Sequence, residues 1–102
     1  MSERVNVVDV TPRDGLQNEK TIVSTRDKLA LIEKLALAGI HEIQATSFVH
    51  PRWVPQMADA EAVAVGIQRF SGIRFSALVP NLKGYERAVA SGIRFLEFVI
   101  AV

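Results

Sequence analysis

The sequence predicts an α/β protein in which helices cover a parallel sheet, and three observations support this fold class. Short apolar stretches alternate with amphipathic ones through the whole chain, in the order β-α-β-α-β-α-β. The apolar stretches are nearly continuous, which is typical of parallel strands buried on both faces. The segments 38–44 and 91–97 also resemble each other, because each passes from a helix end through a glycine into a strand.

The first strand and the first helix are separated by a predicted loop. Residues 5–10 (VNVVDV) are mostly β-branched and predict a buried strand, and a loop is expected over 11–23. Ser24 has capping-box spacing to the aspartate three residues later, so a helix is predicted over 26–39 with the glycine at its end. Its leucines and isoleucine share one face, whereas Lys28 is expected on the polar side.

The remaining elements continue the alternation. They are a strand, a loop, a helix, a strand, a helix and a strand, predicted at 41–48, 49–57, 58–70, 73–80, 81–92 and 93–102. Pro51 and Pro55 prevent a helix through the loop, and Trp53 between them is expected to anchor it. Asn81 is the predicted cap of the last helix, and Gly92 is its predicted stop.

Composition narrows the class of protein. The chain has 102 residues, which suits one small domain, and its net charge of +1 gives no strong attraction to nucleic acid. No apolar run is long enough to span a membrane. The absence of cysteine excludes disulfides and a thiol nucleophile within these residues. The first residues lack the pattern of a signal peptide, so a cytoplasmic protein is expected.

The sequence ends inside its most apolar predicted strand, FVIAV. A parallel strand buried on both faces needs neighbours, so residues 1–102 are expected to be the N-terminal part of a larger α/β domain. An open four-stranded sheet that stops there is the alternative. An unpaired apolar strand also tends to pair with another chain, so a homo-oligomer is expected.

Polar residues follow the first three predicted strands, where the ligands of parallel α/β proteins collect. Arg13 and Asp14 come after the first strand, Ser47 at the end of the second, and Asn81 after the third. A carboxylate is a hard oxygen ligand for Mg²⁺ or Mn²⁺. A guanidinium can hold a carboxylate or a developing enolate oxygen. From position alone, an ordinary ion pair in a loop is an equal alternative for Arg13 and Asp14.

Three longer motifs carry a family resemblance. The stretches VVDVTPRDGLQNEK, ATSFVHPRWVPQMADAE and LVPNLKGYERAVASG closely resemble the N-terminal part of the hydroxymethylglutaryl-CoA lyases. These belong to a family of metal-dependent TIM-barrel lyases and synthases. The resemblance implies a (β/α)₈ barrel, of which this chain would be the first three βα units plus the fourth strand. It also implies an acyl-CoA substrate, cleaved to acetyl-CoA and acetoacetate with Mg²⁺ or Mn²⁺, and neither nucleic acid nor membrane as a partner.

The resemblance assigns roles to four residues of the first motif. Asp14 matches the metal-ligand aspartate, and Arg13 matches the arginine that stabilises the enolate of departing acetyl-CoA. Gln17 would line the substrate pocket, and Lys20 would lie near the CoA end. Further metal ligands and the catalytic cysteine of the family are expected beyond residue 102, so the 102 residues alone are expected to be inactive.

One position departs from the family pattern. Gln44 stands where the lyases usually have a glutamate, so it can hydrogen-bond Arg13 but supplies no negative charge. Asp9 is the carboxylate that could compensate. Ser47 and Asn81 are assigned to the substrate-binding rim. The departure favours, as alternatives, a lyase acting on a different acyl-CoA, or a non-catalytic α/β fragment that kept the motif as structure.

Overall fold

The structure is a computed structural model, and it describes residues 8–98. The strands are β1 (Val8–Asp9), β2 (Glu42–Ser47), β3 (Arg74–Val79) and β4 (Phe95–Phe98). The helices are α1 (Thr25–Leu37), α2 (Ala60–Gly66) and α3 (Leu82–Ser91), with short helical turns η1 (Thr11–Gly15), η2 (Pro55–Met57) and η3 (Ile67–Arg69). The predicted strand residues 5–7 and 99–102 lie outside the described range.

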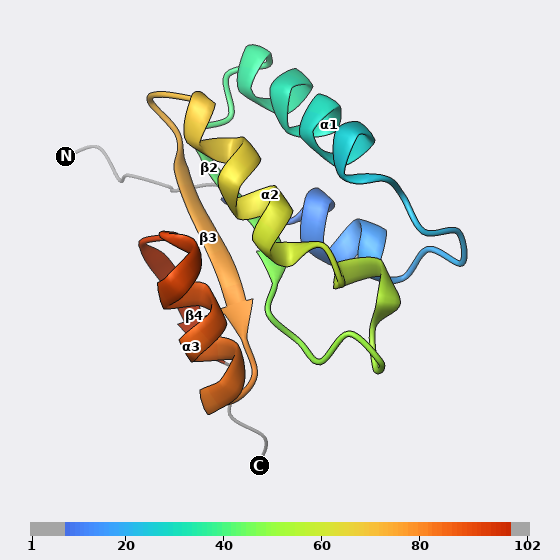
Figure 1. Ribbon diagram of the computed structural model, residues 1–102. Coiled ribbons are helices and arrows are strands. Elements are labelled where there is room, and N and C mark those ends of the chain that lie inside the picture. The colour runs from blue at the N-terminus through green and yellow to red at the C-terminus, as the bar shows by residue number, and fades with distance from the viewer. Residues whose placement is uncertain (1–7, 99–102) are drawn as a thin grey trace, which may run out of the picture.

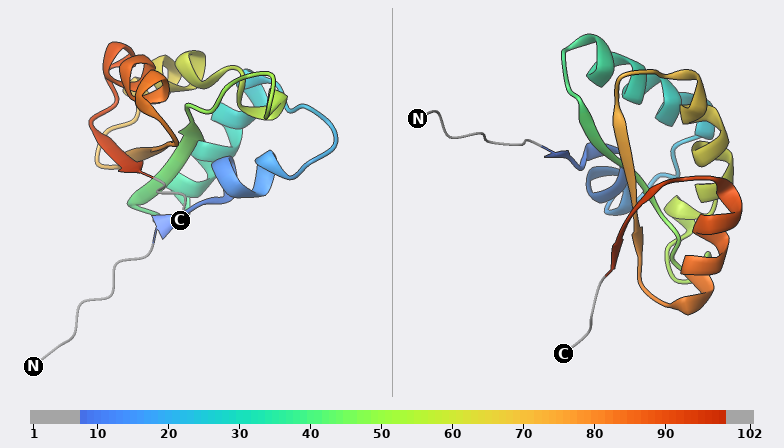
Figure 2. Two further views of the ribbon diagram at one scale, coloured as in Figure 1. Left: turned by 90° about the horizontal axis from the view of Figure 1, so that it is seen from below. Right: turned by 90° about the vertical axis from the view of Figure 1, so that its left-hand side faces the viewer.

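The four strands form one parallel sheet in the order β1-β2-β3-β4, so each strand pairs with its neighbour in sequence. The three α-helices lie on one side of this curved sheet (Figures 1 and 2). A doubly wound sheet would reverse its strand order and carry helices on both faces. Sequential order with helices on one face is instead the arrangement of consecutive units in a (β/α)₈ barrel.

A bulge in β2 changes which side chains face the helices. Gln44 pairs with Ser76 and Thr46 with Ala77, so one residue of β2 is left without a partner. Before the bulge, Ile43 and Ala45 pack under the helices; after it, Thr46 donates to Met57 and Phe48 enters the core. Side chains alternate along a strand, so Ser47 shares the open face with Gln44.

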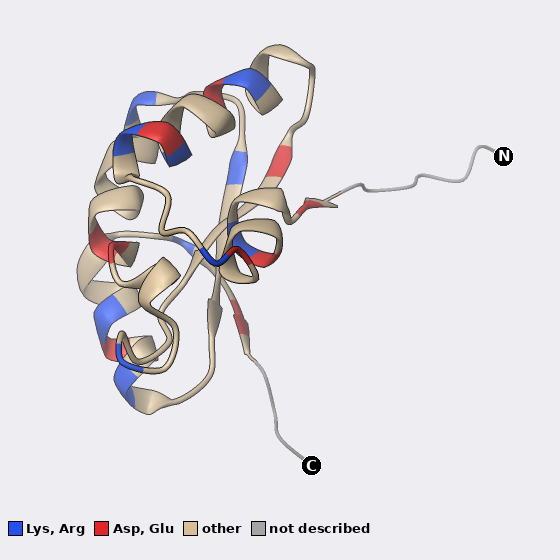
Figure 3. Ribbon diagram, turned by 90° about the vertical axis from the view of Figure 1, so that its right-hand side faces the viewer, with Lys and Arg blue, Asp and Glu red and all other residues tan. Residues whose placement is uncertain are grey.

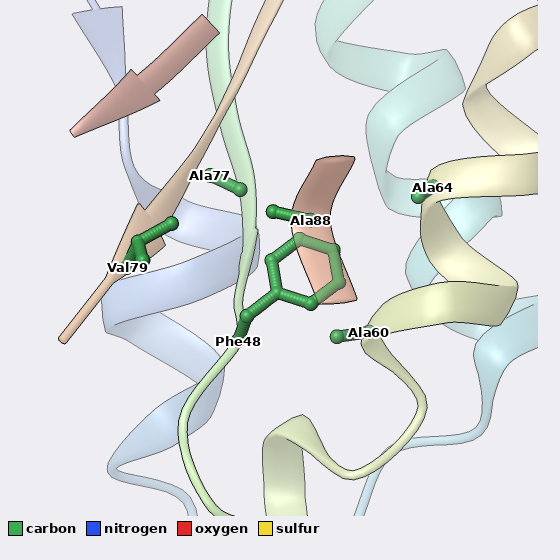
Figure 4. Packing of buried hydrophobic residues seen from close by; sticks show 6 residues of the cluster. All are labelled: Phe48, Ala60, Ala64, Ala77, Val79 and Ala88. Atoms are coloured by element: carbon green, nitrogen blue, oxygen red, sulfur yellow. The ribbon is translucent and has the colours of Figure 1, made fainter. Parts of the chain in front are cut away.

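The core lies between the sheet and the helices and has two adjoining clusters. In the first, the ring of Phe48 contacts small residues of β3, α2 and α3, as Figure 4 shows. Its members are Phe48, Ala60, Ala64, Ala77, Val79 and Ala88. The alanines let α2 and α3 approach closely, and Gly84 is needed for the same reason. A Cβ at Gly84 would lie 2.4 Å from the carbonyl oxygen of Phe48.

The predicted helix signals at α1 and α3 are confirmed. Oγ of Ser24 accepts from the amide of Asp27 at 3.1 Å, and Oδ1 of Asn81 accepts from the amide of Gly84 at 2.8 Å. These side chains satisfy amides that the first helical turn leaves free. Gly92 ends α3 with φ +85°, a conformation that glycine adopts without strain. Among the described residues, no helix is long and apolar enough to cross a membrane.

Four expectations are corrected. The predicted loop 11–23 begins with the helical turn η1. The second helix is shorter than 58–70, because η2 and a turn precede it and its last residues tighten into the 3₁₀ turn η3.

Trp53 does not anchor its loop. Its amide donates to the carbonyl of His50 and closes a turn, and the residue is 82% exposed. Lys28 is only 1% exposed, because its amine donates to Asp59 and to the carbonyl of Gln56.

Arg87 of α3 ties three segments together. Its guanidinium donates to both carboxylate oxygens of Glu61 on α2, at 2.7 and 2.8 Å, and to the carbonyl of Val49 after β2 at 3.1 Å. The hydrogen bonds from Arg87 lower the pKa of Glu61 below its ordinary value of 4.5, and the same bonds raise the pKa of Arg87. The pair therefore links α2 and α3 on the outer side of the core.

We expect this pair to make stability depend on acid. A lowered pKa in the folded protein means that the stabilising effect is present above pH 4.5 and is lost as pH falls through the lower folded value. Glu61→Gln should therefore reduce the free energy of unfolding at pH 7 by less than about 1 kcal/mol, because the carboxylate is half-exposed. Urea titrations from pH 7 to pH 3 should show the difference disappearing. Glu33→Gln, which weakens an exposed 3.9 Å pair with Arg69, is the control with the smaller expected effect.

Candidate active site

The candidate site begins at the turn η1, directly after β1. The amides of Arg13 and Asp14 both donate to the carbonyl of Val10, at 3.1 and 2.7 Å, and this starts a wide π-type turn. Pro12 suits the first turn of η1, where its missing amide hydrogen is not needed, and its ring is buried. Turns of this kind are frequent at functional sites. The turn directs two consecutive side chains to the carboxyl end of the sheet.

Arg13 reaches from η1 to the open face of β2. Its Nε donates to Oε1 of Gln44 at 2.5 Å. The Gln44 residue is 2% exposed and the Arg13 side chain 17% exposed. A hydrogen bond from a charged donor is stronger than a neutral one, so this contact holds the guanidinium plane firmly. Arginine has five N–H donors in a fixed fork, and the N–H groups not used here stay available for a ligand.

Asp14 supplies the one carboxylate that contacts Arg13 among residues 8–98. Its Oδ1 accepts from Nη1 of Arg13 at 3.2 Å, and its side chain is 56% exposed. Asp9 does not compensate for Gln44 by direct contact: among the described residues, the side-chain partners of Arg13 are Gln44 and Asp14, and the carboxylate of Asp9 accepts from the amide of Thr11 at 2.8 Å. Arg13, Asp14 and Gln44 therefore form one cluster, which carries one positive and one negative charge and which we call the Arg13 cluster.

Gln17 lies two residues beyond η1 and contains an unpaired polar atom. Its Oε1 is buried and has no hydrogen-bond donor among the described residues. A buried carbonyl oxygen without a donor costs about 1–3 kcal/mol. Such an atom in a native fold calls for an explanation, and a ligand that donates to it is one explanation. The prediction that Gln17 lines the substrate pocket stays a prediction, and this oxygen supports it.

The other predicted site residues differ in how closely they join the cluster. Ser47 is 1% exposed and shares the open face of β2 with Gln44. Lys20 is exposed, and its side chain forms no described contact with the cluster. Asn81 uses Oδ1 to cap α3, so only its amide nitrogen remains for a ligand.

The donor atoms of this region fit Mg²⁺ or Mn²⁺ in kind. Asp14 offers an exposed carboxylate, which is a hard oxygen ligand. Within residues 8–98, no group of three or more histidine, aspartate or glutamate side chains could hold a metal ion. These residues would therefore supply part of a metal site. Figure 3 shows basic and acidic segments mixed along the helices. None of the described helices therefore presents a continuous surface of one charge, and the charges at the site are those of Arg13 and Asp14.

The buried contacts of Lys28 were not predicted by the sequence analysis. Lys28 of α1 contacts Asp59, 31 residues later in the chain, and the carbonyl of Gln56. The sequence pattern places this lysine on the polar side of the helix, where a solvated amine is the ordinary expectation. No local sequence pattern indicates this contact, because both partners belong to the segment after β2 and the path of that segment depends on tertiary structure.

Comparison with known proteins identifies relatives for almost the whole chain. The HMGL-like family model matches residues 4–102. The mitochondrial hydroxymethylglutaryl-CoA lyase of Macaca fascicularis is 57% identical over 94 residues, which are 92% of this chain and 29% of that protein. The cytoplasmic 3-hydroxy-3-methylglutaryl-CoA lyase of Mus musculus is 52% identical over 92 residues, 90% of this chain and 27% of its own length.

A solved structure supports the fold. The hydroxymethylglutaryl-CoA lyase of Pseudomonas aeruginosa superposes with a TM-score of 0.87 at 46% identity, over 93% of this chain and 32% of that one. The chain thus spans about a third or less of the proteins it matches. Together with the sequential parallel sheet, this similarity confirms the predicted fold: three βα units and the fourth strand of a (β/α)₈ barrel.

A substitution at Gln17 separates a structural role from a ligand-binding one. Gln17→Met removes the unpaired oxygen and keeps an unbranched side chain, so the free energy of unfolding should stay equal or rise by up to about 1 kcal/mol. Urea unfolding followed by circular dichroism measures this. Gln44→Met is the matched comparison, because it deprives Arg13 of its partner and should lower stability. A clear loss of stability in Gln17→Met would show that Oε1 has a structural partner.

Proposed function

Because the chain belongs to the HMGL-like family, we propose that the full-length protein is a carbon–carbon lyase. Its proposed substrate is 3-hydroxy-3-methylglutaryl-CoA, which it would cleave to acetyl-CoA and acetoacetate. The observation that carries this proposal is the Arg13 cluster, in which a guanidinium is held by a buried amide beside an exposed carboxylate. Identity of 57% to a named lyase in the same residues supports it.

The proposed reaction requires charge stabilisation at one oxygen. The hydroxyl on C3 loses its proton, the bond between C2 and C3 breaks, and C3 becomes the ketone of acetoacetate. The bonding electron pair moves to C2 and forms the enolate of acetyl-CoA, which takes up a proton. The free N–H groups of Arg13 would hold the thioester oxygen where this negative charge develops. The bond from Nε to Gln44 supports this role by orienting the guanidinium before the substrate arrives.

The other residues would bind the metal and the substrate. Asp14 would be a ligand of Mg²⁺ or Mn²⁺, supported by its exposed carboxylate. When bound, such an ion acts as a Lewis acid that polarises the substrate oxygens. Gln17 and Ser47 would line the pocket on the open face. Lys20 and the amide nitrogen of Asn81 would contact the acyl-CoA at the rim.

A lyase acting on a different acyl-CoA is the second candidate, and Gln44 favours it. Gln44 accepts the hydrogen bond of Arg13 without the negative charge of a glutamate. The site therefore has one negative charge fewer than the family pattern implies, which favours a substrate that brings its own negative charge close to Arg13. A panel of acyl-CoA substrates tested on the full-length protein distinguishes the two candidates.

We also propose three properties of the whole protein. The 102 residues would be the N-terminal part of the barrel and inactive alone, because Asp14 is their only predicted metal ligand. A homo-oligomer is also proposed; the exposed side chains of Phe95 (40%) and Phe98 (60%) on β4 support association of the 102 residues alone, because β4 would pair with a fifth strand in a complete barrel. A cytoplasmic location is supported by the relative from Mus musculus named cytoplasmic, whereas the relative from Macaca fascicularis is named mitochondrial.

The role of Arg13 is tested by a change that keeps its charge. Arg13→Lys in the full-length protein should lower kcat for release of acetoacetate on the order of 10²–10³-fold, because lysine cannot reproduce the fork of donors at the oxygen. Arg26→Lys, an exposed arginine of α1, is the matched control and should keep the parent rate. Equal rates in the two variants would contradict the proposed role.

The role of Gln44 is tested by restoring the family carboxylate. Gln44→Glu adds a negative charge near Asp14 and should lower the dissociation constant for Mn²⁺ about fivefold, the equivalent of about 1 kcal/mol. Calorimetric titration of the full-length protein measures this without substrate. Gln68→Glu adds the same charge at an exposed position on η3 and should leave the affinity unchanged. No tightening in Gln44→Glu would show that this position does not limit metal binding.

A further inference from the structure

The best-buried charged side chain of the described residues lies outside the Arg13 cluster. The side chain of Lys28 is 2% exposed, and its amine donates to Oδ1 of Asp59 at 2.5 Å and to the carbonyl of Gln56. Lysine is almost never buried without a partner, because removing its charge from water is costly. The position is therefore a specific one, in which the amine is held between α1 and the segment that follows β2.

Both partners of Lys28 extend the contact to the loop that follows η1. The second carboxylate oxygen of Asp59 accepts from Oγ1 of Thr25 at 2.5 Å. The side-chain amide of Gln56 donates to the carbonyl of Glu19 at 2.6 Å. Residues 19–25 are thus held at both ends by side chains of one distant segment. We call Thr25, Lys28, Gln56 and Asp59 the loop clamp.

The held segment contains a predicted substrate contact. Lys20 lies directly after Glu19, and its side chain is exposed. Gln17 and η1 come immediately before the segment. Apart from the clamp, the backbone between η1 and α1 is held by a short turn, in which the amide of Glu19 donates to the carbonyl of Leu16 at 3.2 Å, and by the Asn18 side-chain amide, which donates to the carbonyl of Asp14 at 3.0 Å. The position of Lys20 relative to the Arg13 cluster therefore depends on contacts with the segment after β2.

The arrangement of the clamp favours positioning over general stability. Its hydrogen bonds join a loop, two helix starts and η2, and none of them belongs to the sheet or to the two core clusters. A buried ion pair is weak evidence for stability, since an apolar pair of similar volume is often as stable. The clamp has four hydrogen bonds, one of which is also the ion pair. Because hydrogen bonds are directional, together they favour a single geometry of the loop.

We propose that the loop clamp positions residues 19–25, with Lys20, for binding of the acyl-CoA substrate. This inference deepens the proposed function and rests on it as far as the substrate is concerned. The four clamp residues are positioning residues, because none of them contacts the Arg13 cluster. They couple the loop after β1 to the loop after β2, so that the two rims of the site keep one relative position.

Hydrogen exchange of the free full-length protein tests the clamp without substrate. Thr25→Val replaces the hydroxyl with a methyl group, and Gln56→Glu replaces the amide donor with a carboxylate. Each should raise the exchange rates of the amides in residues 16–24 at least tenfold and leave those of β2 and β3 unchanged. Thr25→Ser keeps the hydroxyl and should restore protection. Gln68→Glu makes the same chemical change as Gln56→Glu at an exposed site and should have no effect.

Kinetics of the same variants test the consequence for the substrate. KM for the acyl-CoA should rise at least fivefold while kcat stays within twofold, because the clamp orders a binding loop and not the reacting groups. Lys28→Met should show the largest effect, with Lys34→Met on the exposed side of α1 as its control. If Lys28→Met does not fold, the other two variants decide the matter.

The outcomes separate the clamp from the proposed function. Local loss of protection without any lyase activity in the parent protein would retain the clamp and reject the lyase. Unchanged exchange in 16–24, or an equal rise throughout β2 and β3, would reject the clamp even if the parent protein is an active lyase. Local loss of protection with an unchanged KM would reject the proposed positioning of Lys20.

Discussion

The hydrogen bond from Nε of Arg13 to Oε1 of Gln44 joins the turn after β1 to the open face of β2, and the candidate site is built around it. Removing a guanidinium from water is costly unless its N–H groups find hydrogen-bond acceptors. The buried side-chain oxygen of Gln44 is such an acceptor for Arg13. That requirement links three features: a wide turn after β1, a parallel pairing of β1 with β2, and a bulge next to Gln44. The turn and the pairing of β1 with β2 bring Arg13 to Gln44, and the bulge sets the face of the residues that follow Gln44.

Two separate groups of polar side chains lie near the carboxyl end of the sheet. The inner group is the Arg13 cluster, where the groups proposed for chemistry lie on the open face. The outer group is the loop clamp, which joins the two loops at the start of α1 and α2. The apolar cores below both groups contain no part of either network. The apolar packing of the core and the polar contacts of the site therefore involve different residues.

Much of the architecture followed from local patterns. The β-α alternation, the caps at Ser24 and Asn81 and the glycine at 92 depend on hydrogen bonds and backbone angles within a few residues, so the sequence could predict them. The pairing of Arg13 with Gln44 was foreseeable only from the family motif. The turn η1 was predicted as a loop, because Thr-Pro-Arg-Asp-Gly has the composition of an ordinary turn and its helical form depends on packing against β2.

By itself, the sequence determined the order of strands and helices, the caps of α1 and α3, and which side chains are candidates for the chemistry. Only the tertiary structure decided which face each of those side chains occupies. The bulge in β2 places Ser47 beside Gln44, although simple alternation would have put it under the helices. The burial of Lys28 was settled by Asp59 and Gln56, residues about thirty positions away. Local propensity is set within one or two turns of chain, whereas burial of a charge depends on which distant groups surround it.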